Sequence, residues 1–221
     1  MIPLRDVIPS RTTPYVTVTL IFLNAIVFLY ELSLGSSLNQ FIFAFGLVPA
    51  EFSWLTVFSS MFLHGGLLHV GGNMLYLWIF GDNVEDRVGH GRFVAFYLLC
   101  GIAAALAQTY TNGGSTVPMV GASGAVAGVM GAYFVLYPRS RIVTLVPIVI
   151  FIQIIEIPAI FFLGIWFLMQ FVSGVGSLAT AGQSIGGIAF WAHVAGFTAG
   201  AAGILVFRRP ERQRVEWWSK N

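Results

Sequence analysis

The sequence predicts an all-α polytopic membrane protein, and its composition and long apolar runs are the main reasons. The chain has 221 residues, of which 57% are hydrophobic and 9% are charged, whereas a soluble domain carries about 25% charged residues. The apolar runs are continuous rather than alternating, which favours helices over the strands of a membrane barrel. The length fits one domain over 1–221, and a net charge of +2 gives no reason to expect a nucleic-acid partner.

The positions of the basic residues predict the number of spans and their orientation. Lys and Arg mark the cytoplasmic side of a membrane protein, and here they fall into a few clusters separated by pairs of apolar runs. An even number of spans therefore separates successive clusters, which puts both termini inside. We expect six helices, near residues 15–34, 68–86, 92–110, 122–137, 156–174 and 189–207, followed by a basic cytoplasmic tail over 208–221.

The segments outside these helices carry further expectations. Residues 35–66 are too many for a turn and too rich in Phe and Trp for a solvated loop, so we expect a first outer loop that lies laterally in the membrane interface. Residues 140–156 are expected to pack along the inner face. The polar, Pro-rich start predicts no cleaved signal peptide. The single cysteine, Cys100, is expected to have a packing role.

Ser123 stands at the head of a charge-free stretch of small residues, 118–133, just after chain breakers at Gly113, Gly114 and Pro118. Free N–H groups at a helix start favour negative charge. A serine nucleophile and its oxyanion site would therefore lie there. Taken alone, this stretch slightly favours another interpretation, a serine that is small enough for tight helix packing.

The rest of the chain reverses that balance, because Asn73, Ser123 and His193 are predicted to lie at one depth. They come 14, 16 and 15 residues before the arginines that follow their helices. At ~1.5 Å per residue, they lie ~21, ~24 and ~22 Å above those arginines. That level is within a hydrocarbon core of ~30 Å and below its outer surface.

Two glycine stripes, one of them headed by a histidine, predict which helices pack together. Their members share the helical offsets 0, 3, 7 and 10 and allow close backbone approach; they are Gly121, Gly124, Gly128 and Gly131 in one helix, and His193, Gly196, Gly200 and Gly203 in the other. Packing these stripes together would bring Ser123 to His193, as a nucleophile and its general base. No acid lies at this depth in either helix, so we expect a dyad.

His69 and Asn73 are four residues apart and share a helix face. They could donate hydrogen bonds to an oxyanion together with the backbone N–H of Ser123, or they could be plain interhelical hydrogen bonds. The 156–174 helix shows no site-like residue. A structural ion-pair or capping network is the simpler interpretation of the charges around Glu85 and Arg87.

Other membrane-protease chemistries fit the sequence less well. There is no HExxH motif, and no Glu or third His joins His69 at ligand spacing, so no metal or cofactor is expected. Asp82 has no second intramembrane aspartate. The only lysine is Lys220, in the tail, and the motif around Ser123 is not the GxSxG of a hydrolase elbow.

The sequence resembles the rhomboid family of intramembrane serine proteases over nearly all its length. Four motifs carry the resemblance: HGGLLHVGGN at 64–73, VEDR at 84–87, GASG at 121–124 and AHVAG at 192–196. The resemblance implies that Ser123 is the nucleophile and His193 the base, with His69, Asn73 and the Ser123 backbone N–H as oxyanion donors. It implies structural roles for the remaining motif residues, which are Gly121, Gly124, Gly196, Gly200, Glu85 and Arg87.

The resemblance also implies an activity and its partners. The expected reaction is cleavage of a membrane-spanning protein near the outer boundary of the bilayer, with the 156–174 helix as a gate and the 173–187 loop as a cap. Two departures from the family pattern stand out. Trp54 is followed by Leu55 instead of Arg, and Ala127 replaces a tyrosine that stacks on the histidine in some members. The His193 ring must then be held by other groups.

Two further functions remain open beside the protease. One is a catalytically silent rhomboid-like protein that binds membrane helices; the presence of both Ser123 and His193 argues against it. The other is a small transporter, but there is no inverted repeat and no pair of intramembrane acids. The short arms outside the apolar runs weakly favour a prokaryotic plasma membrane.

Overall fold

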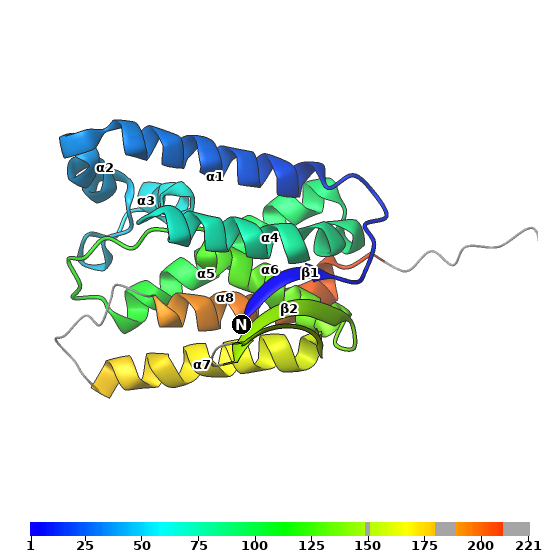
Figure 1. The fold of residues 1–221 in the computed structure, drawn as a ribbon. Helices are drawn as coiled ribbons and strands as arrows, with labels where there is room; N and C mark the ends of the chain where they lie inside the picture. Colours follow the sequence, from blue (N-terminus) through cyan, green and yellow to red (C-terminus); the bar gives the residue numbers. More distant parts are fainter. Residues whose placement is uncertain (149–150, 180–188, 210–221) are drawn as a thin grey trace, which may run out of the picture.

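The computed structural model describes residues 1–148, 151–179 and 189–209. Long helices lying side by side make up most of this part of the chain (Figure 1). They are α1 (Tyr15–Ser33), α4 (Leu67–Val88), α5 (His90–Thr111), α6 (Ser123–Leu136), α7 (Ala159–Ala179) and α8 (Phe190–Phe207). The fold class predicted from the sequence, an all-α polytopic bundle, is confirmed.

Four of these helices, α1, α5, α7 and α8, are long and apolar enough to cross a membrane, and α6 is a shorter apolar helix. Helix α4 is not among the four. It carries the polar side chains of His69 and Asn73 along its length and three acids near its end. The count of six spans therefore stays a prediction.

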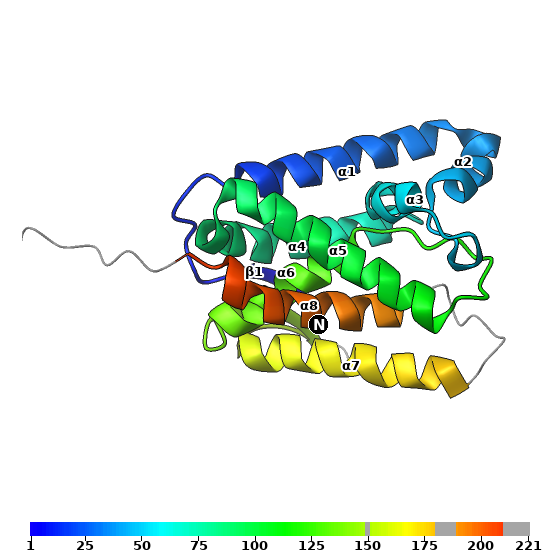
Figure 2. The same ribbon diagram turned by 180° about the vertical axis from the view of Figure 1, so that it is seen from behind.

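Helix α6 lies at the centre of the bundle, with α4, α5, α7 and α8 packed around it (Figures 1 and 2). Every residue from Gly124 to Tyr133 is buried. Small side chains permit this, because α6 and α8 approach to backbone contact: a Cβ at Gly196 would lie 2.0 Å from the carbonyl oxygen of Gly124. The two helices that hold Ser123 and His193 are thus fixed against each other by main chain rather than by flexible side chains.

The chain between α1 and α4 folds into short helices at the end of the bundle where α1 finishes (Figure 1). They are η1 (Gly35–Ser37), α2 (Leu38–Phe45), η2 (Pro49–Glu51), α3 (Trp54–Ser59) and η3 (Ser60–Phe62). Exposed aromatic side chains here, such as Phe43 and Trp54, suit a segment in contact with the membrane interface. Two hydrogen bonds between the backbones of Leu47 and Met119, of 2.9 and 2.8 Å, tie this loop to the segment that precedes α6.

The sequence reasoning missed a small antiparallel sheet, which joins the polar N-terminal start to the segment that was expected only to pack along the inner face. It consists of β1 (Ile2–Asp6), β2 (Arg141–Ile148) and β3 (Phe151–Pro158), in the order β1-β2-β3. The β2 and β3 segments are rich in Ile and Val, which favours strands. In the sequence, however, they look like the other apolar stretches of a membrane protein. Because β3 reaches Pro158, α7 begins at Ala159 and extends to Ala179, later than the 156–174 expected.

The buried carboxylate of Glu85 joins α4 to the start of α1. It accepts hydrogen bonds from the backbone N–H groups of Val16 and Thr17, at 3.0 and 2.8 Å, and from the Thr17 hydroxyl. The His90 ring nitrogen Nδ1 lies 2.5 Å from Oε1, the carboxylate oxygen that also accepts from Val16. Free N–H groups at a helix start are well satisfied by a carboxylate, so this contact fixes α1 against α4.

Candidate active site

Ser123 and His193 are in direct contact. The Ser123 Oγ lies 2.8 Å from Nε2 of His193. Ser123 is the first residue of α6, and His193 is in the first turn of α8. Gly124, next to Ser123, and Gly196, three residues after His193, come into backbone contact and so hold the two helix ends close together. Sequence reasoning put both residues at one depth, and the structure brings them together.

Gly121 shapes the turn into α6. Its φ is +129°, a backbone conformation that residues with a side chain rarely adopt. Its N–H donates a 2.8 Å hydrogen bond to the carbonyl of Ser60, in η3 of the segment between α1 and α4. A Cβ at this position would also lie 2.8 Å from the His69 ring. Glycine is therefore needed at 121 both for the turn and for the space that the His69 ring occupies.

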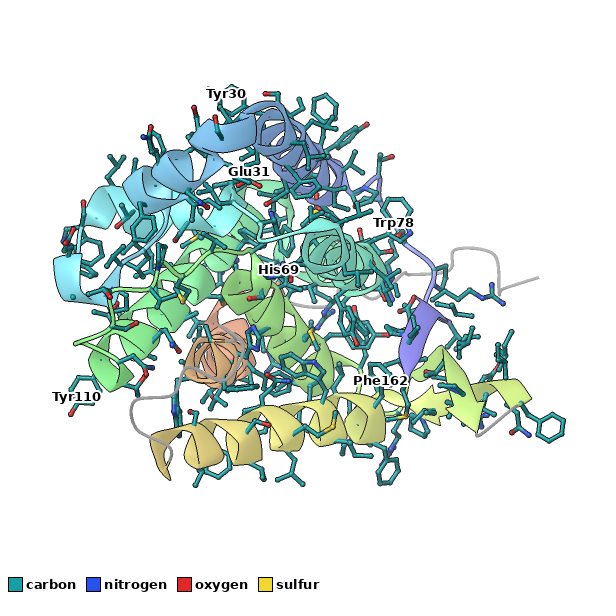
Figure 3. All side chains as sticks on the ribbon, turned by 60° about the vertical axis from the view of Figure 1, so that its left-hand side comes forward. Tyr30, Glu31, His69, Trp78, Tyr110 and Phe162 are labelled. Carbon is teal, nitrogen blue, oxygen red and sulfur yellow. The ribbon has the colours of Figure 1, made fainter. Side chains whose placement is uncertain are left out.

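His69 and Asn73 lie on the wall of α4 that faces α6. Figure 3 shows His69 in the interior, between these two helices. Its Nδ1 accepts a 3.3 Å hydrogen bond from the backbone N–H of Gly65, which leaves Nε2 on the side of Gly121 and Ser123. Asn73 is 8% exposed, and its Nδ2 has no hydrogen-bond partner among the residues that the structure describes. Both side chains thus have a donor group available at the site.

His64 lies behind His69, with ring centroids 5.2 Å apart. Its backbone N–H donates to the carboxylate of Glu31, which is buried at the end of α1. Burial is the main cause that lowers the pKa of His64 to about 4. This ring is therefore neutral near pH 7 and adds no positive charge beside the site.

Two residues of α7 hold the His193 ring, and sequence reasoning missed both. Gln170 places its Oε1 2.8 Å from Nδ1 of His193. The Trp166 ring lies against the imidazole, with centroids 5.8 Å apart and an interplanar angle of 38°. The sequence did contain a hint of this role: the Gln170 amide stands in a bulky apolar helix. It is four residues from Trp166 and hence on the same helix face. Position 127 is an alanine, which has no ring to stack on the imidazole, and these two side chains hold the imidazole instead.

The site opens into a cavity of about 660 Å³. Its walls come from α4, α6, α7 and α8, and from the segments that precede α6 and α8. The side chains relevant to chemistry in its lining are His69, Asn73, Ser123, Gln170 and His193. A cavity of this size has room for water and for an extended peptide segment.

The fold and the site together define a multi-pass helical membrane protein with a serine and a histidine in contact inside a cavity. Residues 51–210, well over half of the chain, match the rhomboid domain family. The chain therefore belongs to the rhomboid family, as its motifs indicate.

Several relatives in this family are described as proteases. The chain is 37% identical over 109 residues to the rhomboid protease GluP of Bacillus subtilis, a match that covers 48% of this chain and 21% of that protein. It is 32% identical to the rhomboid protease AarA of Providencia stuartii, over 52% of this chain and 48% of that protein. It is 30% identical to rhomboid-type serine protease 2 of Emericella nidulans, over 76% of this chain and 30% of that protein. The matched regions are thus less than half the length of each relative.

Proposed function

We propose that this protein is an intramembrane serine endopeptidase that cleaves membrane-spanning proteins. The observation that carries the proposal is the 2.8 Å contact between Ser123 Oγ and His193 Nε2, inside a cavity of about 660 Å³. A hydroxyl in that contact can lose its proton to the imidazole as it attacks a carbonyl. Membership of a family that contains proteases supports the same conclusion.

The first half of the reaction forms an acyl-enzyme. The Ser123 Oγ bonds to the carbonyl carbon of the scissile peptide while its proton passes to Nε2 of His193. The carbonyl oxygen becomes an oxyanion, stabilised by the Ser123 backbone N–H at the start of α6 and by His69 and Asn73. When the carbon–nitrogen bond breaks, the imidazolium returns the proton to the leaving amine.

The second half of the reaction consumes one water molecule. His193 takes a proton from the water, whose oxygen attacks the acyl carbon, and the same oxyanion donors act again. The serine ester then breaks, Ser123 recovers the proton, and a free carboxyl group leaves. The cavity supports this step, because water must reach a site that lies between helices.

We further propose that the cut falls near the outer boundary of the membrane and that both termini are cytoplasmic. Basic segments meet at one end of the bundle: the Arg209 N–H donates to the carbonyl of Arg87, and Arg92 donates to the carbonyl of Val206. A basic end favours the cytoplasmic side. Ser123 and His193 stand at the other end of their helices. The single domain over 1–221 and the prokaryotic plasma membrane belong to the same proposal.

A reconstituted cleavage assay tests this function. The protein is placed in liposomes with a single-pass membrane protein as substrate, and the fragment masses locate the cut. We expect cleavage by the natural protein and by Met169→Leu, an exposed position on α7, but none by Ser123→Ala. Cleavage that persists in Ser123→Ala would refute the nucleophile. Binding of membrane helices without cleavage, in every variant, would favour the catalytically silent rhomboid-like protein.

A further inference from the structure

Helix α7 supplies both side chains that hold the His193 ring. The Gln170 Oε1 lies 2.8 Å from Nδ1, and Trp166 packs against the imidazole. The two residues are one helical turn apart and so lie on one face of α7. The ring is therefore fixed on one side by α7 and on the other by its contact with Ser123 on α6.

The contact with Gln170 selects one form of the neutral ring. A neutral imidazole carries its proton on one nitrogen and accepts with the other. An amide oxygen can only accept, so a bond between Oε1 and Nδ1 requires the proton on Nδ1. Nε2 is then the acceptor that faces the Ser123 hydroxyl, which is the form that a general base needs.

We propose that Gln170 is a positioning residue that keeps the proton of the neutral His193 ring on Nδ1 and thereby prepares Nε2 to accept the proton of Ser123. This inference rests on the proposed function. Gln170 does in this chain what a carboxylate does in a three-residue serine site, but with a neutral amide. A neutral group avoids the large cost of burying an unpaired charge at membrane depth.

Because Gln170 is on α7, the form of the His193 ring that can act as a base depends on the position of α7. Only 22% of the most apolar stretch of α7 is buried, against 39% for α5. Helix α7 follows β3 directly and packs against α8, α6 and the sheet. If the Gln170 end of α7 moved away from α8, the imidazole would lose its acceptor and its ring contact together. The reactive form of His193 therefore belongs to the arrangement in which α7 lies against α8.

Two substitutions at Gln170 distinguish hydrogen bonding from packing. Gln170→Met keeps length and apolar bulk but removes the acceptor, whereas Gln170→Glu keeps an oxygen that accepts from Nδ1. We would measure the rate of labelling by a fluorophosphonate in detergent, with Met169→Leu as the control on the exposed side of α7.

We expect Gln170→Met to label about 10- to 100-fold more slowly, the range for losing a hydrogen bond to a group that becomes charged in the reaction. Gln170→Glu should retain much more labelling than Gln170→Met, because its oxygen still accepts from Nδ1, and Met169→Leu should label at the natural rate. A packing role predicts the reverse order, with Met tolerated and Glu not. That order, or a Gln170→Met protein that labels as fast as the natural one, would overturn the inference.

A readout that is independent of activity separates this inference from the proposed function. Nitrogen-15 NMR of histidine-labelled protein shows which ring nitrogen carries the proton, and the signal missing from His193→Ala identifies His193. We expect a proton on Nδ1 in the natural protein and in Gln170→Glu, and its loss to Nε2 or to exchange in Gln170→Met. A proton on Nε2 in the natural protein overturns the inference even if no variant folds. A natural protein with the Nδ1 proton but no labelling instead overturns the proposed function.

Discussion

Gly200 of α8 lies against the main chain of Gly128 in α6, so closely that a Cβ at Gly200 would be 1.8 Å from the Gly128 carbonyl oxygen. The pair Gly196 and Gly124 makes the same kind of contact one turn nearer the site. No side-chain rearrangement can relieve such an overlap, because the obstacle is backbone. These contacts fix the separation of the helices that carry Ser123 and His193.

Gly200→Ala should therefore destabilise the bundle and separate the serine from the histidine. Overpacking in a core costs about 1–3 kcal/mol, and we expect the upper part of that range because α6 and α8 must move apart. Thermal unfolding in detergent measures the effect. Gly203→Ala is the matched control, since its Cβ would approach only the Phe96 ring, at 3.4 Å. Equal melting temperatures for the two variants would contradict the role of the backbone contact.

Asn73→Ala and His69→Ala should slow cleavage without abolishing it. Each removes one proposed donor to the developing oxyanion, and the loss of such a donor typically costs about 10²–10³-fold in kcat. Steady-state kinetics with a membrane-embedded substrate measures the change, which should fall on kcat rather than on KM. Leu67→Ala, an exposed position on α4, is the control. Variants that retain the full kcat would show that these side chains are only packing groups.

Attachment of the N-terminal strand should depend on pH through Asp6. Its carboxyl accepts a 2.6 Å hydrogen bond from the Tyr133 hydroxyl. Burial, which is the main cause, and the nearby Asp82 raise the pKa of Asp6 from 3.8 to about 6, and the bond from Tyr133 only partly opposes this. The folded protein therefore favours the protonated form of Asp6. The stabilisation that protonated Asp6 gives to the folded state is complete below about pH 4 and is lost as the pH rises through 6.

Hydrogen exchange of the β1 and β2 amides, corrected for the intrinsic pH dependence, should thus show stronger protection at pH 5 than at pH 8. Asp6→Asn keeps a polar partner for Tyr133 and removes the titration, so the difference in protection should disappear. Protection that instead increases toward pH 8, or a difference that persists in Asp6→Asn, would be inconsistent with this account.

The sequence was sufficient for the fold class and the family, but less so for the surroundings of the site. Apolar runs and arginine spacing indicate helices, and the offsets from Gly196 to Gly203 indicate which face of α8 packs. Strands β2 and β3 were missed because a strand and a buried helix segment are both runs of apolar residues. The pairing of β2 with β1 is a contact between residues more than a hundred positions apart, such as Ile2 and Leu145, and no local pattern reports it.

Gln170 and Trp166 were missed for a related reason. A single amide in an apolar helix does not say which neighbour it faces, and that depends on how α7 rotates against α8. Ser123 and His193 were easier, because each stands beside a glycine stripe that fixes its helix face. The sequence thus located the serine and the histidine that lie in contact, whereas the groups around the His193 ring required the three-dimensional structure.

The most direct test of the central proposal is labelling of the purified protein with a fluorophosphonate, which reacts only with an activated serine. The natural protein is compared with Ser123→Ala and His193→Ala, with thermal melting to establish that all three are folded. We predict labelling of the natural protein and none of either variant, since the serine needs the imidazole 2.8 Å away to lose its proton. A folded natural protein that takes up no label, or a His193→Ala protein that labels at the natural rate, would contradict a Ser123–His193 dyad.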